Sequence, residues 1–170
     1  EGWFYEGAGI YRHVWLSKTA PLHVTKWGTF VKPVIEGNAA RIDVDVTVSN
    51  EAKTDATFAI RQEVFDADGM LVGSADFANL TTKAVSTGDF ATSLDLAHAR
   101  LWSLEDPYLY HLRTTIKQGD EAVDTYDTPF GVRTVTWEPD KGFSLNGKTI
   151  KLQGTDNHQD HAGVGVAIPD

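Results

Sequence analysis

The sequence predicts an all-β protein: an immunoglobulin-like antiparallel β-sandwich of seven to eight strands, with a C-terminal β-hairpin extension. Three observations predict this fold. Short segments alternate apolar and polar side chains, as strands with one buried face do. Turn residues recur every 8–12 residues or so between about residue 21 and residue 131, a spacing typical of antiparallel sandwiches. The same region shows no helical periodicity.

The clearest strand follows Pro107, which lacks a backbone N–H and therefore fits the start of a strand better than its middle. The residues after it alternate, and we expect Tyr110 and Leu112 to point into the core. Just before this strand, Leu101 and Trp102 are large and apolar. We expect them to close one end of the core, with the Trp102 N–H donating to a carbonyl.

The other strands alternate in the same way. The clearest of them places Val44 and Val46 in the core. Pro33 interrupts the first sandwich strand and so marks an edge of the sheet. Asp66 to Gly69 is predicted as a hairpin loop, because glycine can adopt the left-handed conformation that such loops need. The predicted ranges are 10–16, 30–35, 41–50, 56–66, 70–74, 87–96, 108–117 and 122–130.

Composition limits the possible functions. The 170 residues suffice for one domain plus roughly 70 further residues, since domains usually run about 100–150 residues. The chain has no cysteine, which excludes disulfides and thiolate metal sites but fits either bacterial cytoplasm or periplasm. No apolar run is long enough to span a membrane.

The net charge of −9 lies in the middle of the chain, where residues 41–131 carry seven basic and sixteen acidic side chains. An acidic domain repels nucleic acid and anionic membranes, so we expect neither as a partner.

Both ends of the chain differ from the middle. Residues 1–20 open on a cluster of three consecutive aromatics, which fits either an edge strand of the main core or the last strand of a preceding domain. The second is favoured, because a domain rarely exposes an aromatic cluster at its start. In residues 132–170, Asn146-Gly147 is a strong signal for a type I′ hairpin turn, and a strand is expected from Thr149 to Gly154.

Several segments, in order along the chain, together resemble landmarks of glycoside hydrolase family 2, which includes β-galactosidases, β-glucuronidases and β-mannosidases. They are Gly7–Val14 (GAGIYRHV), Leu101-Trp102 with Pro107–Tyr110 (PYLY), Phe130–Arg133 (FGVR), Gly142–Lys148 (GFSLNGK) and Leu152–His158 (LQGTDNH). Where the family often has Arg-Gly-Val-Asn before the histidine, this chain has Gln153–Asn157 (QGTDN). The run after His158 is most similar to bacterial β-galactosidases, which favours galactosides.

The resemblance implies a domain arrangement. Residues 1–20 would be the last strand of a jelly-roll sugar-binding domain, and residues 21–131 the immunoglobulin-like sandwich. Residues 132–170 would be the entry hairpin and first strand of a truncated (β/α)8 catalytic barrel. The sandwich would then contact both the jelly roll and the barrel within one protein.

The resemblance also implies retaining hydrolysis of terminal β-glycosides in carbohydrate metabolism, with one carboxylic acid and one carboxylate nucleophile. In the family both are glutamates on later barrel strands, beyond Asp170. We therefore assign no catalytic residue to this chain, expect it to be inactive alone, and expect no cofactor.

The candidate substrate-binding residues are His158, Asp160 and His161. His158 would follow the C-terminal end of the first barrel strand, on the face where such barrels build active sites; the alternative is an ordinary loop histidine. Asp160 and His161 could contact sugar, support His158 or lie in a solvated loop. With Asp156 these residues could also form a metal site, but zinc sites usually need three or four close nitrogen or sulfur ligands, so we predict none.

A second hypothesis is a self-standing carbohydrate-binding or adhesion module on the same sandwich. Such a module would need exposed aromatic side chains aligned along one face. The predicted outward positions are mainly Asp, Thr, Ser, Arg and Lys, which disfavours it.

Overall fold

The computed structural model describes residues 10, 13–156, 163 and 165. Thr19–Ile150 form one compact unit, and the described residues outside that range belong to a second unit. In the part of the chain that is described, all regular structure is β and no helix could cross a membrane. The strands are β1 (Leu22–Glu36), β2 (Ala39–Asn50), β3 (Ala56–Phe65), β4 (Leu71–Thr82), β5 (Ser86–Leu96), β6 (Tyr110–Gln118), β7 (Glu121–Phe130), β8 (Val135–Glu138), β9 (Gly142–Leu145) and β10 (Lys148–Thr149).

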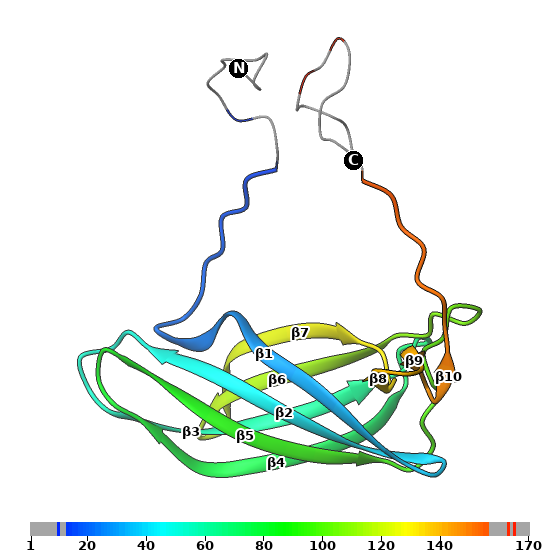
Figure 1. The fold of residues 1–170 in the computed structure, drawn as a ribbon. Coiled ribbons are helices and arrows are strands. Elements are labelled where there is room, and N and C mark those ends of the chain that lie inside the picture. Colours follow the sequence, from blue (N-terminus) through cyan, green and yellow to red (C-terminus); the bar gives the residue numbers. More distant parts are fainter. Residues whose placement is uncertain (1–9, 11–12, 157–162, 164, 166–170) are drawn as a thin grey trace. The chain divides into compact units, whose positions relative to one another are not determined.

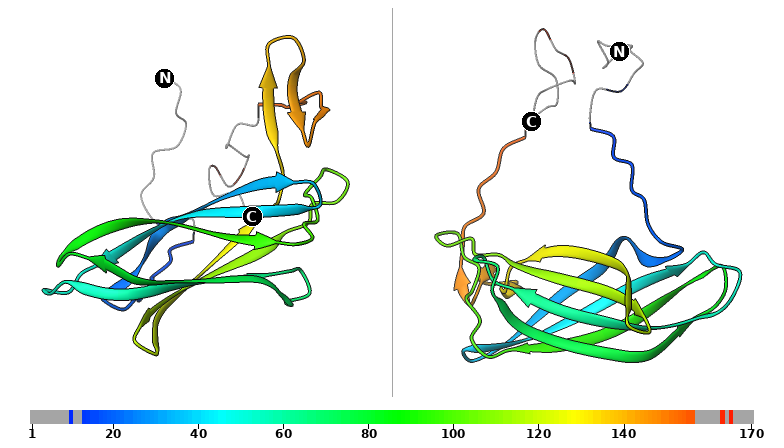
Figure 2. Two further views of the ribbon diagram at one scale, coloured as in Figure 1. Left: turned by 90° about the horizontal axis from the view of Figure 1, so that it is seen from below. Right: turned by 180° about the vertical axis from the view of Figure 1, so that it is seen from behind.

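Seven of these strands form the predicted sandwich. One sheet has the order β1-β2-β5 and the other the order β4-β3-β6-β7, with every pairing antiparallel. Figures 1 and 2 show the two sheets lying one over the other. The predicted immunoglobulin-like fold class is confirmed, because this class has seven antiparallel strands in two packed sheets.

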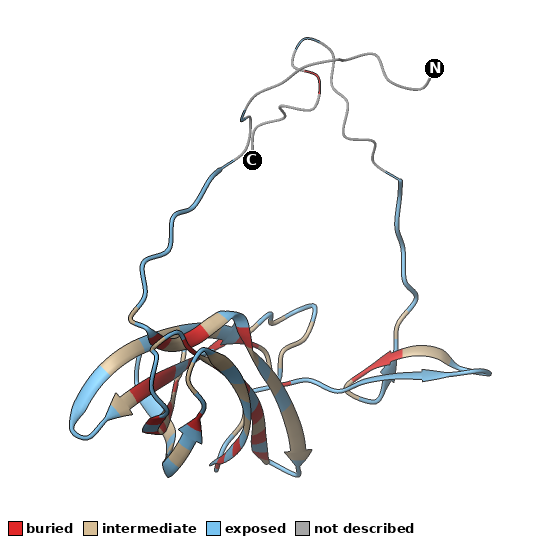
Figure 3. Cartoon of the chain, turned by 90° about the vertical axis from the view of Figure 1, so that its left-hand side faces the viewer, coloured by how far each residue is buried: buried red, intermediate tan, exposed pale blue. Residues whose placement is uncertain are grey.

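The core lies between the two sheets. Along β2 and β3, buried residues alternate with intermediate or exposed ones, and β6 does so over its first half; Figure 3 shows buried residues in red and the others in tan or blue. Val44, Val46, Tyr110 and Leu112 are all buried, as predicted. Burying one such aliphatic side chain contributes about 1.5–3 kcal/mol, so the cluster accounts for much of what holds the sheets together.

One polar group crosses this core. Gln62, in β3, is fully buried and donates from Nε2 to Thr92 Oγ1 of the opposite sheet at 3.3 Å. Its Oε1 accepts from Thr114 Oγ1 of β6 at 2.8 Å, and the Thr92 hydroxyl in turn donates to the Val44 carbonyl at 3.1 Å. The amide is satisfied on both sides, so its burial carries no unpaired polar atom.

Two strands are longer than predicted. β1 begins at Leu22 rather than near residue 30. Its first part does not show in the sequence pattern, because a bulge in which Trp27 has φ = 61° breaks the alternation. β4 runs to Thr82 rather than ending at Ser74, and a second bulge there places Asn79 at φ = 60°. Pro33 lies on β1, an edge strand of its sheet as predicted.

β8, β9 and β10 form a small third sheet of order β10-β9-β8. Asn146 and Gly147 connect β9 to β10 with φ = 49° and 77°, as the predicted type I′ turn requires. The strand predicted from Thr149 to Gly154 is wrong in extent. Only Lys148–Thr149 is a strand, because the described residues offer residues 151–156 no neighbouring strand.

The strand predicted over residues 10–16 is also not formed among the described residues of that segment. Val14, Trp15 and Leu16 are exposed there and lie outside any sheet. Apolar alternation alone does not make a strand, since the backbone groups also need a hydrogen-bonding neighbour.

Candidate functional site

The three predicted substrate-binding residues, His158, Asp160 and His161, lie outside the described residues. Asp156, the last residue described before them, is exposed. Across the described ranges, no three histidine or acidic side chains come together to hold a metal ion. Two other places carry organised side chains: a joint between the sandwich and the β8–β10 hairpin, and a pocket on the outer face of the four-stranded sheet.

The joint brings together three segments that are distant in the sequence. Leu101 pairs with Val132 in an isolated parallel bridge, and the backbone N–H of Trp102 donates to the Val132 carbonyl at 2.9 Å. Val132, the second residue after β7, is fully buried, so the chain leaving β7 is anchored in the interior of the unit. The segment that leaves the sandwich is thereby held on the loop before β6.

Trp102 belongs to this joint rather than to the core. It is only half-buried, and Leu101 is exposed, so the prediction that they close the core end is wrong for Leu101 and half right for Trp102. A Cβ on Gly131 would lie 2.9 Å from the Trp102 Cβ, so only glycine allows this approach. The guanidinium of Arg133 lies over the indole, 4.6 Å from the ring centroid, and covers its outer face.

Asn146 connects the hairpin turn to both other segments. Its side-chain Oδ1 accepts from the Thr134 backbone N–H at 2.9 Å, and its own N–H donates to the Thr134 carbonyl at 2.9 Å. Its Nδ2 donates to the Trp102 carbonyl at 2.9 Å. Asparagine tolerates the left-handed backbone better than most residues, so one side chain both makes the turn and fastens it.

The loop before β6 is itself braced. Arg100 pairs with Asp106 through two hydrogen bonds of 2.7 and 2.9 Å, and its guanidinium lies 4.3 Å from the Tyr108 ring centroid. Hydrogen bonding to Asp106 raises the pKa of Arg100 above its usual value. The Arg100 N–H donates to the Tyr110 hydroxyl at 2.8 Å. The joint therefore rests on a fixed support.

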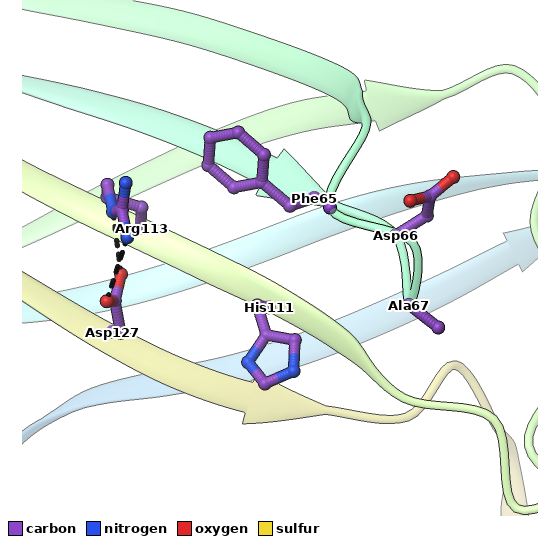
Figure 4. Close-up of a pocket in the computed structure, with 7 residues that line it drawn as sticks. Phe65, Asp66, Ala67, His111, Arg113 and Asp127 are labelled. Carbon is purple, nitrogen blue, oxygen red and sulfur yellow. Dashed lines mark hydrogen bonds and ion pairs between the residues drawn. The ribbon is translucent and has the colours of Figure 1, made fainter.

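The pocket lies on the outward face of β3, β6 and β7 and has a volume of about 330 Å³. Figure 4 shows Phe65, His111, Arg113 and Asp127 along it, with the loop that begins at Asp66 at one end. Its full lining is Phe65, Asp66, Ala67, Gly69, His111, Arg113 and Asp127.

Strand register explains this arrangement. Phe65 pairs with His111, which pairs with Pro129, so three ring side chains form one row across three strands. In the adjacent row, Arg113 pairs with Asp127 and donates Nε and Nη2 to its carboxylate at 2.9 and 3.1 Å. This bond raises the pKa of Arg113 and keeps the guanidinium charged.

Sequence reasoning missed the pocket because its members come from three strands. The alternation places each residue on the outward face, but it does not report the register of the β3–β6 pairing, which sets Phe65 beside His111. The residues of the joint, in contrast, were recognised as separate motifs. The sequence contains no signal that these motifs meet.

Comparison with known proteins gives one consistent family. The family described as glycosyl hydrolases family 2 matches residues 22–133. The chain is 36% identical over 166 residues to a β-galactosidase of Bacteroides ovatus, covering 97% of this chain and 19% of that protein. It is 33% identical over 167 residues to a β-glucuronidase of Bacteroides fragilis, covering 94% of this chain and 24% of that protein.

Solved structures agree. A glycosyl hydrolase family 2 member from Bacteroides cellulosilyticus is similar with a TM-score of 0.87 and 30% identity, over 96% of this chain and 21% of that chain. A β-glucuronidase of Bacteroides uniformis is similar with a TM-score of 0.81 and 29% identity, over 95% of this chain and 20% of that chain. The chain thus spans about a fifth of the length of these relatives.

Proposed function

This chain belongs to glycosyl hydrolase family 2, and on that premise we propose that it is the non-catalytic sandwich module of a retaining β-glycosidase, linking the catalytic domain to the rest of the enzyme. The observation that carries the proposal is the joint. It fastens the outgoing segment to the sandwich at Trp102, Val132 and Asn146, so the chain that follows leaves from a fixed support.

A module that holds another domain needs rigidity, and the joint supplies it. Hydrogen bonds from Asn146 reach two separate segments, and Arg133 covers the indole of Trp102. Ser144 and Leu145 of β9 are buried, and the Ile150 N–H donates to the Phe143 carbonyl at 2.9 Å. The hairpin is therefore buried at the end of β9 and hydrogen-bonded up to Ile150, while β8 and β10 are exposed.

The acidic side chains support a non-catalytic role. A retaining glycosidase needs one carboxyl group whose pKa is raised, so that it can protonate the leaving oxygen. The pKa of Asp43, of Asp55 and of Glu105 is lowered, which is the opposite of what such an acid needs. Hydrogen bonds from Arg41, from Lys83 and within the loop at Glu105 respectively are the main causes.

For the whole enzyme we propose a terminal β-galactoside as substrate, with His158, and with it Asp160 and His161, on the rim of the active site. The similarity to a β-galactosidase supports this, although relatives named β-glucuronidase match too. A histidine on that rim can donate to sugar hydroxyls, contacts that strengthen as charge develops in the transition state.

The test uses the full-length enzyme and this chain side by side. The full-length protein should hydrolyse a nitrophenyl β-galactoside faster than the matching glucuronide, and the 170-residue chain should hydrolyse neither. In the full-length protein, His158→Ala should lower kcat/KM by roughly 2–4 kcal/mol of transition-state stabilisation, a scale seen for loss of single donors. His98→Ala, at an exposed residue of the sandwich, is the matched control.

Turnover by the purified chain that a point mutation in it abolishes would refute the non-catalytic assignment. Wild-type kinetics for the folded His158→Ala enzyme would refute the role of that histidine. Preference for the glucuronide would leave the module assignment standing and reject the galactoside.

A further inference from the structure

We propose that the pocket bounded by Phe65, His111, Arg113 and Asp127 is a non-catalytic binding site for a single neutral sugar residue. This inference goes beyond the proposed function, because it concerns the surface of the sandwich itself and not the catalytic domain. It gives the sandwich a carbohydrate-binding site at one place on its surface, although the sequence disfavoured a self-standing carbohydrate-binding module.

The first argument is the pairing of ring faces with polar groups. Phe65 and His111 stand in one row of the lining, and Arg113 and Asp127 stand in the row beside it. A pyranose presents the same division, with C–H groups on its faces and hydroxyls around its rim. Ring side chains can pack against the C–H faces of the sugar. The carboxylate can accept hydrogen bonds from the hydroxyls, and the guanidinium can donate to them.

The second argument is that the polar groups are fixed before a ligand arrives. Arg113 is held by two hydrogen bonds to Asp127, and its guanidinium lies 5.3 Å from the Phe65 ring centroid. The N–H groups of Nη1 stay available, because Nε and Nη2 are the atoms that bind Asp127. A guanidinium fixed in this way loses less side-chain entropy when a ligand binds.

The loop at the end of the pocket is fixed as well. Asp66 Oδ1 accepts from the N–H groups of Asp68 and Met70 at 3.0 and 2.8 Å, and the Ala67 N–H donates to the Tyr108 hydroxyl at 3.1 Å. The imidazole of His111, in contrast, is exposed and hydrogen-bonds to no other described residue. It can offer one donor or one acceptor to a hydroxyl.

Charge selects the class of sugar. The lining carries two carboxylates, Asp66 and Asp127, against the single guanidinium of Arg113. A uronic acid would bring a further negative charge to this excess, so the pocket favours neutral hexoses over uronates.

The experiment is an NMR titration of the isotope-labelled 170-residue chain with methyl β-galactoside, lactose, glucuronate and methylammonium. We expect saturable shifts of the His111 ring, Arg113 Nε–H and Gly69 amide signals with the two neutral sugars, with a Kd on the order of 1–10 mM. Glucuronate should bind at least about tenfold more weakly because of the charge. Methylammonium should not reproduce the shifts.

Phe65→Ala and Arg113→Ala should each weaken binding at least about tenfold. Matched controls lie on the outer face of the other sheet. Arg41 forms the same two-bonded pair, with Asp43 at 2.8 and 3.2 Å, and Phe30 is an exposed ring on β1, so Arg41→Ala and Phe30→Ala should leave the Kd unchanged. Should Phe65→Ala fail to fold, Arg113→Ala decides alone, because its side chain is exposed.

The proposal is overturned by the absence of saturable shifts at about 50 mM sugar, a concentration well above the expected Kd. It is also overturned by unchanged binding in the folded Arg113→Ala variant, or by a response to methylammonium alone, which would indicate a site for a basic side chain. None of these results depends on turnover, so the outcome is separate from that for the proposed glycosidase.

Discussion

Replacing Asn146 tests the joint, because one side chain there combines a backbone role with two hydrogen bonds. Asn146→Gly keeps the freedom to adopt φ = 49° but removes the bonds to the Thr134 N–H and the Trp102 carbonyl. At about 0.5–1.5 kcal/mol each, their loss should lower the free energy of opening the hairpin by about 1–3 kcal/mol. Asn146→Ala should cost about 1 kcal/mol more, since alanine resists the left-handed region.

Asn79 provides the matched control. It has φ = 60° within β4, is exposed, and has no hydrogen bond from its side chain to another described residue. Asn79→Gly and Asn79→Ala therefore report the backbone contribution alone. The difference between the glycine variants at the two positions isolates the side-chain bonds of Asn146.

The assay is native-state hydrogen exchange of two amides that Asn146 does not bind. The Ile150 N–H donates to Phe143 and the Trp102 N–H donates to Val132, so both report opening of the joint. Exchange at these amides should speed up by roughly 5- to 150-fold in Asn146→Gly, the rate equivalent of 1–3 kcal/mol. Equal exchange in Asn146→Gly and Asn79→Gly would refute the reasoning, because the side-chain bonds would then contribute nothing.

Three further predictions concern the sandwich. Gln62→Leu should lower the free energy of unfolding by about 1–3 kcal/mol in a urea titration, because it leaves the buried Thr114 hydroxyl without its acceptor. Adding Thr114→Val should recover most of the loss, and a double variant less stable than Gln62→Leu alone would contradict this. Val85→Gly should raise the free energy of unfolding by about 0.5–1 kcal/mol and raise the Tm, because Val85 is exposed and has φ = 50°, which glycine adopts more easily than valine. The control Val72→Gly, within β4, should lower the free energy of unfolding. The Lys83 ammonium and the Ala84 N–H lower the pKa of Asp55, so the stabilisation from Asp55 is present above about pH 4 and is lost as the pH falls through the lowered folded-state pKa. The stability difference between the wild type and Asp55→Asn should therefore shrink in acid, and a constant difference from pH 7 to pH 2 would contradict the lowered pKa.

The sandwich core could be predicted from the sequence because period-two alternation reports directly which side chains share a face. Val44 and Val46 follow that rule without interruption, and so do Tyr110 and Leu112. The rule fails where a bulge adds a residue. Trp27 sits in such a bulge, and the predicted first strand begins only after it. Asn79 sits in another, within the part of β4 that the prediction leaves out.

Side-chain size was a poorer guide than alternation. Trp102 was expected in the core because it is large and apolar, yet its surroundings are Gly131, Arg133 and the Asn146 side chain. Gly131 lies 29 positions away in the sequence and Asn146 lies 44 away, and no local pattern reports such contacts. The motifs of the joint were recognised singly, and only the fold brings them into one place.

The half-buried state of Trp102 follows from the two tasks of the joint. A fully buried indole would pack only against the sandwich and could not contact the outgoing segment. A fully exposed indole would contact neither the sandwich nor that segment. Here Gly131 approaches the base of the Trp102 side chain so closely that no Cβ fits, and the Arg133 guanidinium lies over the indole ring. Thr134 directly follows Arg133, and its backbone N–H donates a hydrogen bond to Asn146 Oδ1. The stretch that leaves the sandwich is thus held by the indole at one residue and by the hairpin turn at the next, which fixes its position and its direction together.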